Sequence, residues 1–131
     1  MKTSVYPAQT KPSLIVMPKS LLFNWEKELE KFAPQLNHYT YYANSRDIEE
    51  ALQHEVILTT YAMMRNDIEK FKDVGFYYVV LDESQNIKNL QAQTSKAVML
   101  LQGKHRLALS GTPIDNNLSE LYSLFRVLNP E

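Results

Sequence analysis

A short apolar run that ends in two adjacent acids constrains this sequence more than any other segment. Tyr77-Tyr78-Val79-Val80-Leu81 has no polar break and is rich in β-branched and aromatic residues, as is typical of a strand buried on both faces of a parallel sheet. Asp82 and Glu83 follow it directly. Ligands of open α/β sheets bind just beyond the carboxyl ends of the strands, so this acid pair is a candidate site for a metal ion or a phosphate. Taken alone, the pair is explained more simply as the point where a strand leaves the core.

Strand-like runs alternate with helix-like segments along the whole chain. The expected strands are 13–17, 38–42, 56–60, 77–81 and 106–110. Helical spacing of apolar residues covers 20–32, 46–53, 61–71, 91–101 and 118–128, with Ser20 expected as the N-cap of the first helix. This alternation predicts a three-layer α/β sandwich around a mainly parallel sheet, formed by residues 13–131 after a flexible lead-in over residues 1–12.

Composition narrows the class of protein further. The chain has 131 residues, enough for one domain with a proper core, and a net charge of −1, which argues against a strongly basic surface spread over the whole chain. It has no cysteine, which excludes disulfides and thiolate metal sites. No apolar run approaches membrane-spanning length and the first residues do not resemble a signal peptide. We therefore expect a protein without a membrane partner that is not secreted, located in the cytoplasm or nucleoid of a bacterium or the nucleus of a eukaryote.

Four of the expected strands end in polar residues. These ends are Pro18-Lys19, Thr59-Thr60-Tyr61, Asp82-Glu83-Ser84-Gln85 and Ser110-Gly111-Thr112. Parallel strands would bring all four to one edge of the sheet. Phosphoryl transfer needs such an edge, because an aspartate can hold Mg²⁺ through water and a neighbouring carboxylate can orient or deprotonate the attacking water. Hydroxyls and backbone N–H groups of a Ser-Gly-Thr turn could in turn sense a phosphate.

The same segments carry a resemblance to a known family. Leu14 to Trp25 is similar to motif Ia of the Swi/Snf-type DNA-dependent ATPases, and Ile57 to Tyr61 to their motif Ib. Val80 to Asn89 resembles motif II, the Walker B box, and Leu107 to Leu118 resembles motif III, continued by Glu120 to Pro130. The resemblance implies a RecA-like first lobe of a superfamily-two ATPase that moves along double-stranded DNA.

On the nucleotide side, the resemblance implies a catalytic group formed by three residues of motif II. Asp82 would hold Mg²⁺ through water, Glu83 would act as the catalytic base, and Gln85 would couple the nucleotide to a second ATPase lobe of the same chain. The turn Ser110-Gly111-Thr112 would link ATP hydrolysis to movement. ATP and Mg²⁺ are therefore the implied cofactors of the whole protein.

On the DNA side, the resemblance implies contacts with the DNA backbone at the ends of the first and third strands. Backbone N–H groups, hydroxyls and one cation suffice for contacts with phosphates that do not depend on base sequence. The residues at the matching positions are Pro18, Lys19, Thr59 and Thr60.

Four features depart from the family pattern. Ser84 stands where the family more often has alanine or glycine, and Leu90 replaces the usual proline after Asn89. The sequence has only three glycines and no G-x-x-x-x-G-K-[ST] loop, so we expect the chain to lack the phosphate-loop strand of the lobe. Compared with the family, we expect it to lack the second lobe too. Alone, the chain is then expected neither to bind ATP tightly nor to hydrolyse it. The missing strand would expose the sheet edge beside the strand ending at Ser110, which favours self-association.

Two other interpretations stay open at this point. The chain could be a non-catalytic protein-interaction module that retains the RecA-like fold, although a scaffold has no need of Asp82 and Glu83. An unrelated metal hydrolase could use the same acids, but no histidine or carboxylate cluster supports it, since His38, His54 and His105 lack metal-ligand spacing.

Overall fold

A five-stranded parallel sheet forms the centre of the protein, as predicted. The computed structural model describes residues 12–32, 34, 36–82 and 92–108, without the side chains of residues 32, 92 and 108. The strand order is β2-β3-β1-β4-β5, and all four pairings are parallel. The strands are β1 (Ser13–Met17), β2 (His38–Tyr41), β3 (Val56–Thr60), β4 (Gly75–Leu81) and β5 (Gln102–Ala108).

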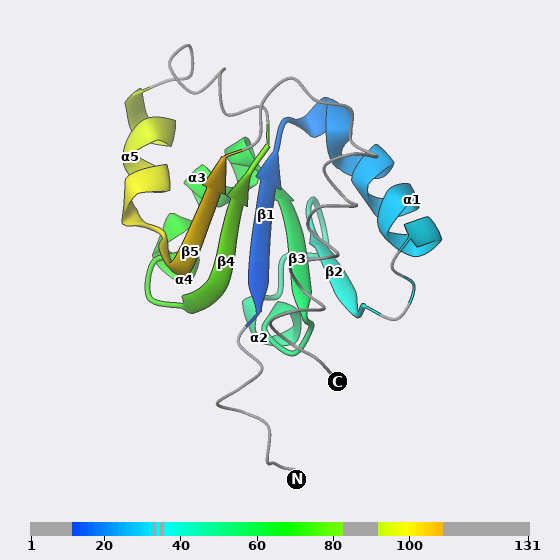
Figure 1. Cartoon of the computed structure of the whole chain (residues 1–131). Coiled ribbons are helices and arrows are strands. Elements are labelled where there is room, and N and C mark those ends of the chain that lie inside the picture. Colours follow the sequence, from blue (N-terminus) through cyan, green and yellow to red (C-terminus); the bar gives the residue numbers. More distant parts are fainter. Residues whose placement is uncertain (1–11, 33, 35, 83–91, 109–131) are drawn as a thin grey trace, which may run out of the picture.

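Helices cover both faces of this sheet (Figure 1). They are a 3-10 turn η2 (Lys19–Leu21) followed by α1 (Leu22–Phe32), α2 (Ile48–Ala51), α3 (Tyr61–Asn66), α4 (Ile68–Phe71) and α5 (Ala92–Leu100). One buried cluster lies between the sheet and α1, and contains Ile15, Met17 and Trp25. The other lies between the sheet and helices α2 to α5, and contains Leu14 and Val16. Successive β1 residues thus point to opposite layers, which confirms the three-layer sandwich.

Several predicted boundaries were wrong, and tertiary contacts explain two of them. The last strand begins at Gln102 rather than at residue 106, because Gln102 and Gly103 pair with Gly75 and Phe76 of β4 despite their low strand propensity. The helix predicted over residues 61–71 is divided at Asp67, whose carboxylate accepts a hydrogen bond from the Tyr41 hydroxyl of β2 at 2.7 Å.

Other boundaries differ by a few residues. Ser20 is not an N-cap, since it lies inside η2, which begins after Pro18 without a side-chain cap. The helix predicted over residues 46–53 is the shorter α2, capped by the Asp47 carboxylate. The lead-in over residues 1–12, apart from its last residue, and the helix predicted over residues 118–128 lie outside the described residues.

Gly103 lets β5 lie close to a side chain of the neighbouring strand. A Cβ atom built on Gly103 would come within 2.6 Å of Val79 Cγ2, and Val79 is fully buried. We expect Gly103→Ala to lower the free energy of unfolding by about 1–3 kcal/mol, the usual cost of overpacking a core. Urea unfolding followed by circular dichroism measures this change. Lys104→Ala, one residue along the same strand at an exposed position, is the control, and equal losses in the two variants would contradict the explanation.

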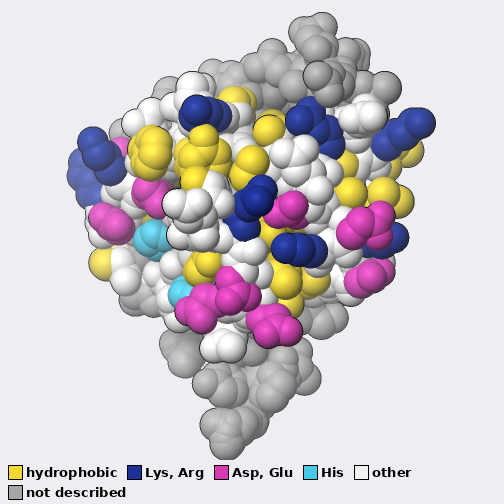
Figure 2. Space-filling model, turned by 180° about the vertical axis from the view of Figure 1, so that it is seen from behind, with side chains coloured by type: hydrophobic (Ala, Val, Ile, Leu, Met, Phe, Trp, Pro, Cys, Tyr) yellow, Lys and Arg dark blue, Asp and Glu magenta, His cyan; other side chains and the backbone are white. Residues whose placement is uncertain are grey.

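The face of the molecule seen from behind carries side chains of both charge signs (Figure 2). Figure 2, seen from behind, shows Lys and Arg side chains mixed with Asp and Glu over the upper and middle parts of that face, whereas Asp and Glu gather at its lower end. Among the described helices, none has the length and apolar character that crossing a bilayer would require.

Candidate functional site

The carboxyl ends of four strands meet at one edge of the sheet. Met17 of β1 is in register with Thr60 of β3, Val16 with Leu81 of β4, and Leu81 with Ala108 of β5. The predicted common edge is therefore confirmed for the described ends of these strands. Ligands bind at such an edge in α/β proteins, so the candidate site is built here.

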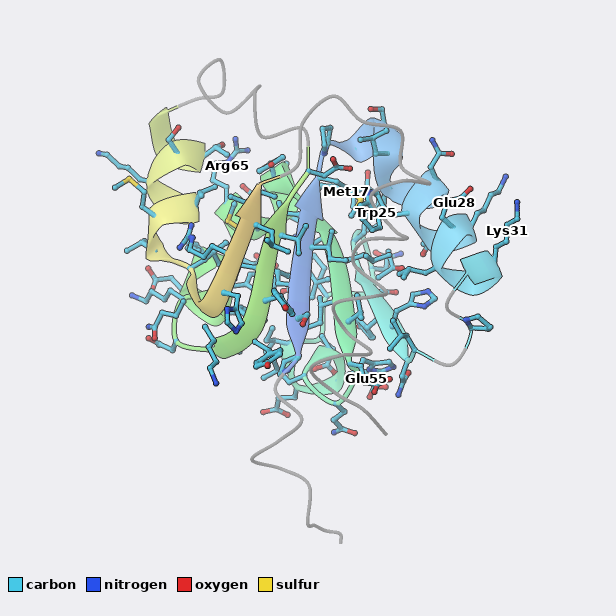
Figure 3. The ribbon with its side chains drawn as sticks, viewed as in Figure 1. Met17, Trp25, Glu28, Lys31, Glu55 and Arg65 are labelled. Carbon is cyan, nitrogen blue, oxygen red and sulfur yellow. The ribbon has the colours of Figure 1, made fainter. Side chains whose placement is uncertain are left out.

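Asp82 lies at this edge, directly after β4, and is only 3% exposed. Its backbone N–H donates to the carbonyl of Val16 at 2.8 Å, which continues the pairing of β4 with β1. Its carboxylate oxygen Oδ2 accepts a hydrogen bond from Trp25 Nε1 at 2.7 Å, and its backbone carbonyl accepts one from the Tyr61 hydroxyl at 2.8 Å. Figure 3 shows Trp25 projecting from α1 toward the end of β1 that carries Met17. The carboxylate is thus held in one orientation.

The donor chemistry of Asp82 fits the ion that the resemblance implies. Mg²⁺ is bound through one or two carboxylates, with waters and substrate phosphates completing its shell, rather than by an all-protein cage. In the part of the chain that the structure describes, no three His, Cys, Asp or Glu residues gather as a metal cluster. A single buried carboxylate at a strand end suits Mg²⁺ held together with a nucleotide better than it suits a structural metal.

A pocket of about 290 Å³ opens at the carboxyl ends of β1, β2 and β3, and one of its lining residues, Tyr61, contacts Asp82. Lys19 is exposed at its margin, with Nζ 6.0 Å from the centre of the Tyr42 ring. The pocket therefore combines one cation with polar and aromatic groups. It is lined by Pro18, Lys19, Tyr42, Thr60, Tyr61, Ala62 and Met63.

Thr59 and Thr60, the two threonines predicted to contact DNA, make hydrogen bonds within the fold through their hydroxyl groups. Thr59 is fully buried and its hydroxyl donates to the carbonyl of Tyr41 at 2.9 Å, which joins β3 to β2. Thr60 is 2% exposed and its hydroxyl accepts from the N–H of Met63 at 3.1 Å, so it caps α3. Of the four residues predicted to contact DNA, Pro18, Lys19 and Thr60 line the pocket, while Thr59 does not.

The remaining predicted site residues lie outside the described residues. These are Glu83, Gln85 and the turn Ser110-Gly111-Thr112. The last described residue before that turn, Ala108, pairs with Leu81, which directly precedes Asp82.

Sequence reasoning missed the contacts that Trp25 and Tyr61 make with Asp82. Trp25 packs α1 against the sheet and is completely buried among Ile15, Met17 and Leu58. Its hydrogen bond spans 57 positions of the chain, so no local pattern reports it. A weak signal existed, because a buried indole N–H needs an acceptor.

A hydrogen-bonded pair, Tyr41 and Asp67, joins β2 to the junction of α3 and α4. Tyr41 is fully buried, and its ring lies edge-on to Phe71 with centroids 4.8 Å apart. Burial raises the pKa of the Tyr41 hydroxyl, and its hydrogen bond to the Asp67 carboxylate raises the pKa further. Arg46 lies 3.9 Å from the same carboxylate. Tyr41 therefore stays a neutral donor and holds β2 against the α3–α4 junction.

The fold and the edge site together define an α/β lobe of the RecA-like kind. The family model for the SNF2-related domain matches residues 2–131, so the chain belongs to the SNF2-related domain family.

Two curated relatives and one solved structure illustrate this membership. The chain is 40% identical over 122 residues to the uncharacterized ATP-dependent helicase MG018 of Mycoplasma genitalium, and 45% identical over 123 residues to the TATA-binding protein-associated factor mot1 of Aspergillus fumigatus. These matches cover 91% of this chain but 12% and 6% of the two relatives. The Sulfolobus solfataricus SWI2/SNF2 ATPase core in complex with dsDNA superposes with a TM-score of 0.70 at 42% identity, covering 95% of this chain and 26% of that one. The chain thus spans a small part of its relatives.

Proposed function

We propose that this chain contributes part of the first ATPase lobe of a motor that couples ATP hydrolysis to movement along double-stranded DNA. The observation that carries the proposal is that one residue, Tyr61, belongs both to the pocket and to the surroundings of Asp82. Tyr61 lines the pocket and donates its hydroxyl to the backbone carbonyl of Asp82, so the expected DNA-facing groups and the expected nucleotide acid adjoin at one sheet edge. The proposal is also supported by the similarity to the SWI2/SNF2 ATPase core solved in complex with dsDNA. That structural match covers 95% of this chain.

In this proposal the two sides of the edge have different tasks. Asp82 would hold Mg²⁺ through water, and the cation would neutralise charge on the phosphates when the nucleotide is bound. Glu83 is proposed as the base and Gln85 as the link to a second lobe, with Ser110-Gly111-Thr112 relaying hydrolysis to movement. Lys19 and the pocket beside it would meet the phosphate backbone without reading bases.

A charge-removal variant tests the DNA side. We expect Lys19→Ala to weaken binding of a labelled DNA duplex similarly for unrelated sequences, and to reduce the slope of log affinity against log salt by about 0.9, the value for one released counterion. Fluorescence anisotropy over a salt series measures both quantities for the 131-residue chain.

The matched control for that variant is Lys72→Ala. Lys72 precedes β4, at the opposite edge of the sheet, where it pairs with Glu69 at 2.8 Å. Its removal should leave the salt slope unchanged. Equal slopes for the native chain and Lys19→Ala would remove Lys19 from the proposed DNA contact.

A second measurement tests the nucleotide side. The printed sequence has no G-x-x-x-x-G-K-[ST] loop, whose backbone N–H groups and lysine hold the phosphates in such enzymes. We therefore expect calorimetric titration of the 131-residue chain with Mg-ATP to show no tight binding. Micromolar affinity would contradict this part of the proposal.

A further inference from the structure

Asp82 is held by groups from three elements that are distant in the sequence. Val16 of β1 accepts its N–H, Trp25 of α1 donates to Oδ2, and Tyr61 of α3 donates to its backbone carbonyl, at 2.8, 2.7 and 2.8 Å. Trp25 is fully buried and Tyr61 is 6% exposed, so both donors act where water is largely excluded.

We propose that Trp25 and Tyr61 are positioning residues for the Asp82 carboxylate. The inference rests on the proposed function only in taking Asp82 as the residue that holds the divalent cation. Trp25 fixes the orientation of the carboxyl group, and Tyr61 fixes the peptide that carries it. Both donate their N–H or O–H to Asp82, so their effect on cation binding would pass through Asp82.

A buried indole N–H needs a hydrogen-bond acceptor, but this need alone does not explain why Trp25 bonds the carboxylate of Asp82. A neutral backbone carbonyl would satisfy Trp25 Nε1. Burying a carboxylate costs far more than burying a neutral acceptor, unless the charge is compensated. Asp82 is only 3% exposed, and both its carboxylate and its backbone carbonyl accept hydrogen bonds. A functional role of the carboxylate therefore explains this arrangement better than the needs of the indole.

The bonding chemistry also favours an oriented carboxylate, because Oδ2 of Asp82 accepts from Trp25 Nε1 at 2.7 Å. An indole N–H can only donate, so Trp25 can meet Asp82 only through an acceptor oxygen of the carboxyl group. Trp25 cannot turn away from Asp82 without leaving its place among Ile15, Met17 and Leu58. Outer groups that orient a ligand in this way typically change metal affinity about 10–100-fold when they are removed.

The test uses Mn²⁺ in place of Mg²⁺, because its paramagnetism reports its position. In the 131-residue chain, Mn²⁺ near Asp82 should broaden the backbone amide signals of Val16 and Asp82, and the concentration dependence gives an apparent affinity. We expect Trp25→Phe and Tyr61→Phe each to weaken this affinity about tenfold, since each keeps an aromatic ring but loses the donor. Asp82→Asn should abolish the selective broadening.

Tyr41→Phe is the matched control. It removes a hydroxyl from a buried tyrosine that donates to a different carboxylate, Asp67, at 2.7 Å. It should leave the Mn²⁺ affinity unchanged. If Tyr41→Phe weakened binding as much as Tyr61→Phe, general loss of stability would explain the effect and the inference would be overturned.

The remaining outcomes separate this inference from the proposed function. Native affinity in both Trp25→Phe and Tyr61→Phe would overturn the positioning roles while leaving the cation role of Asp82 intact. Unchanged broadening in Asp82→Asn would refute the cation role itself, and the inference with it. If Trp25→Phe fails to fold, Tyr61→Phe decides alone.

Discussion

Trp25→Ala should cost this protein more stability than any other single truncation on the α1 side of the sheet. The side chain is fully buried between α1 and the sheet, and its N–H bonds the Asp82 carboxylate. Truncating a buried aromatic residue costs about 3–5 kcal/mol, and here a buried carboxylate also loses a donor. Because native domains are stable by only about 5–15 kcal/mol, we expect a large fall in the urea midpoint.

The measurement for this variant is circular dichroism, since Trp25 is the only tryptophan and its removal abolishes the fluorescence signal. Phe23→Ala is the control on the same helix, because Phe23 is 60% exposed. That variant should change the free energy of unfolding by no more than about 0.5 kcal/mol. Comparable losses in the two variants would mean that helix propensity, rather than burial, governs α1.

Phe71→Ala is expected to have a similarly large effect from the opposite face of the sheet. Phe71 ends α4, is fully buried, and contacts the rings of Tyr41 and Phe76 with centroids at 4.8 and 6.4 Å. Its truncation should lower the free energy of unfolding by about 3–5 kcal/mol. Phe71→Leu, which keeps most of the volume, should lose less than half as much.

This second variant keeps Trp25, so it also tests whether the two layers unfold together. Trp25 reports on the α1 side, whereas far-UV circular dichroism reports on the whole sheet and its helices. Coincident transitions by both probes are expected for one cooperative domain. A Trp25 transition unchanged from that of the native chain would show that the α1 layer unfolds independently of the cluster around Phe71.

The strand pattern was predictable because buried parallel strands consist of short continuous runs of apolar residues. Ser13–Met17, Val56–Thr60 and the end of β4 at Leu81 agree with their predicted positions. Prediction failed where long-range pairing sets the boundary, as at Gln102, where partners on β4 extend a strand of polar residues. It failed likewise at Asp67, where a hydrogen bond from β2 marks the break between α3 and α4.

The sequence alone determined the kind of fold and which polar residues follow the strands, because hydrophobic periodicity and strand ends are local properties of a chain. Only the tertiary structure decided what holds Asp82, since Trp25 and Tyr61 reach it across 57 and 21 positions. It also decided that Thr59 is buried against β2 while Lys19 stands exposed at a pocket. Contacts of this kind depend on which strands become neighbours, and that order is a property of the packed sheet rather than of any segment.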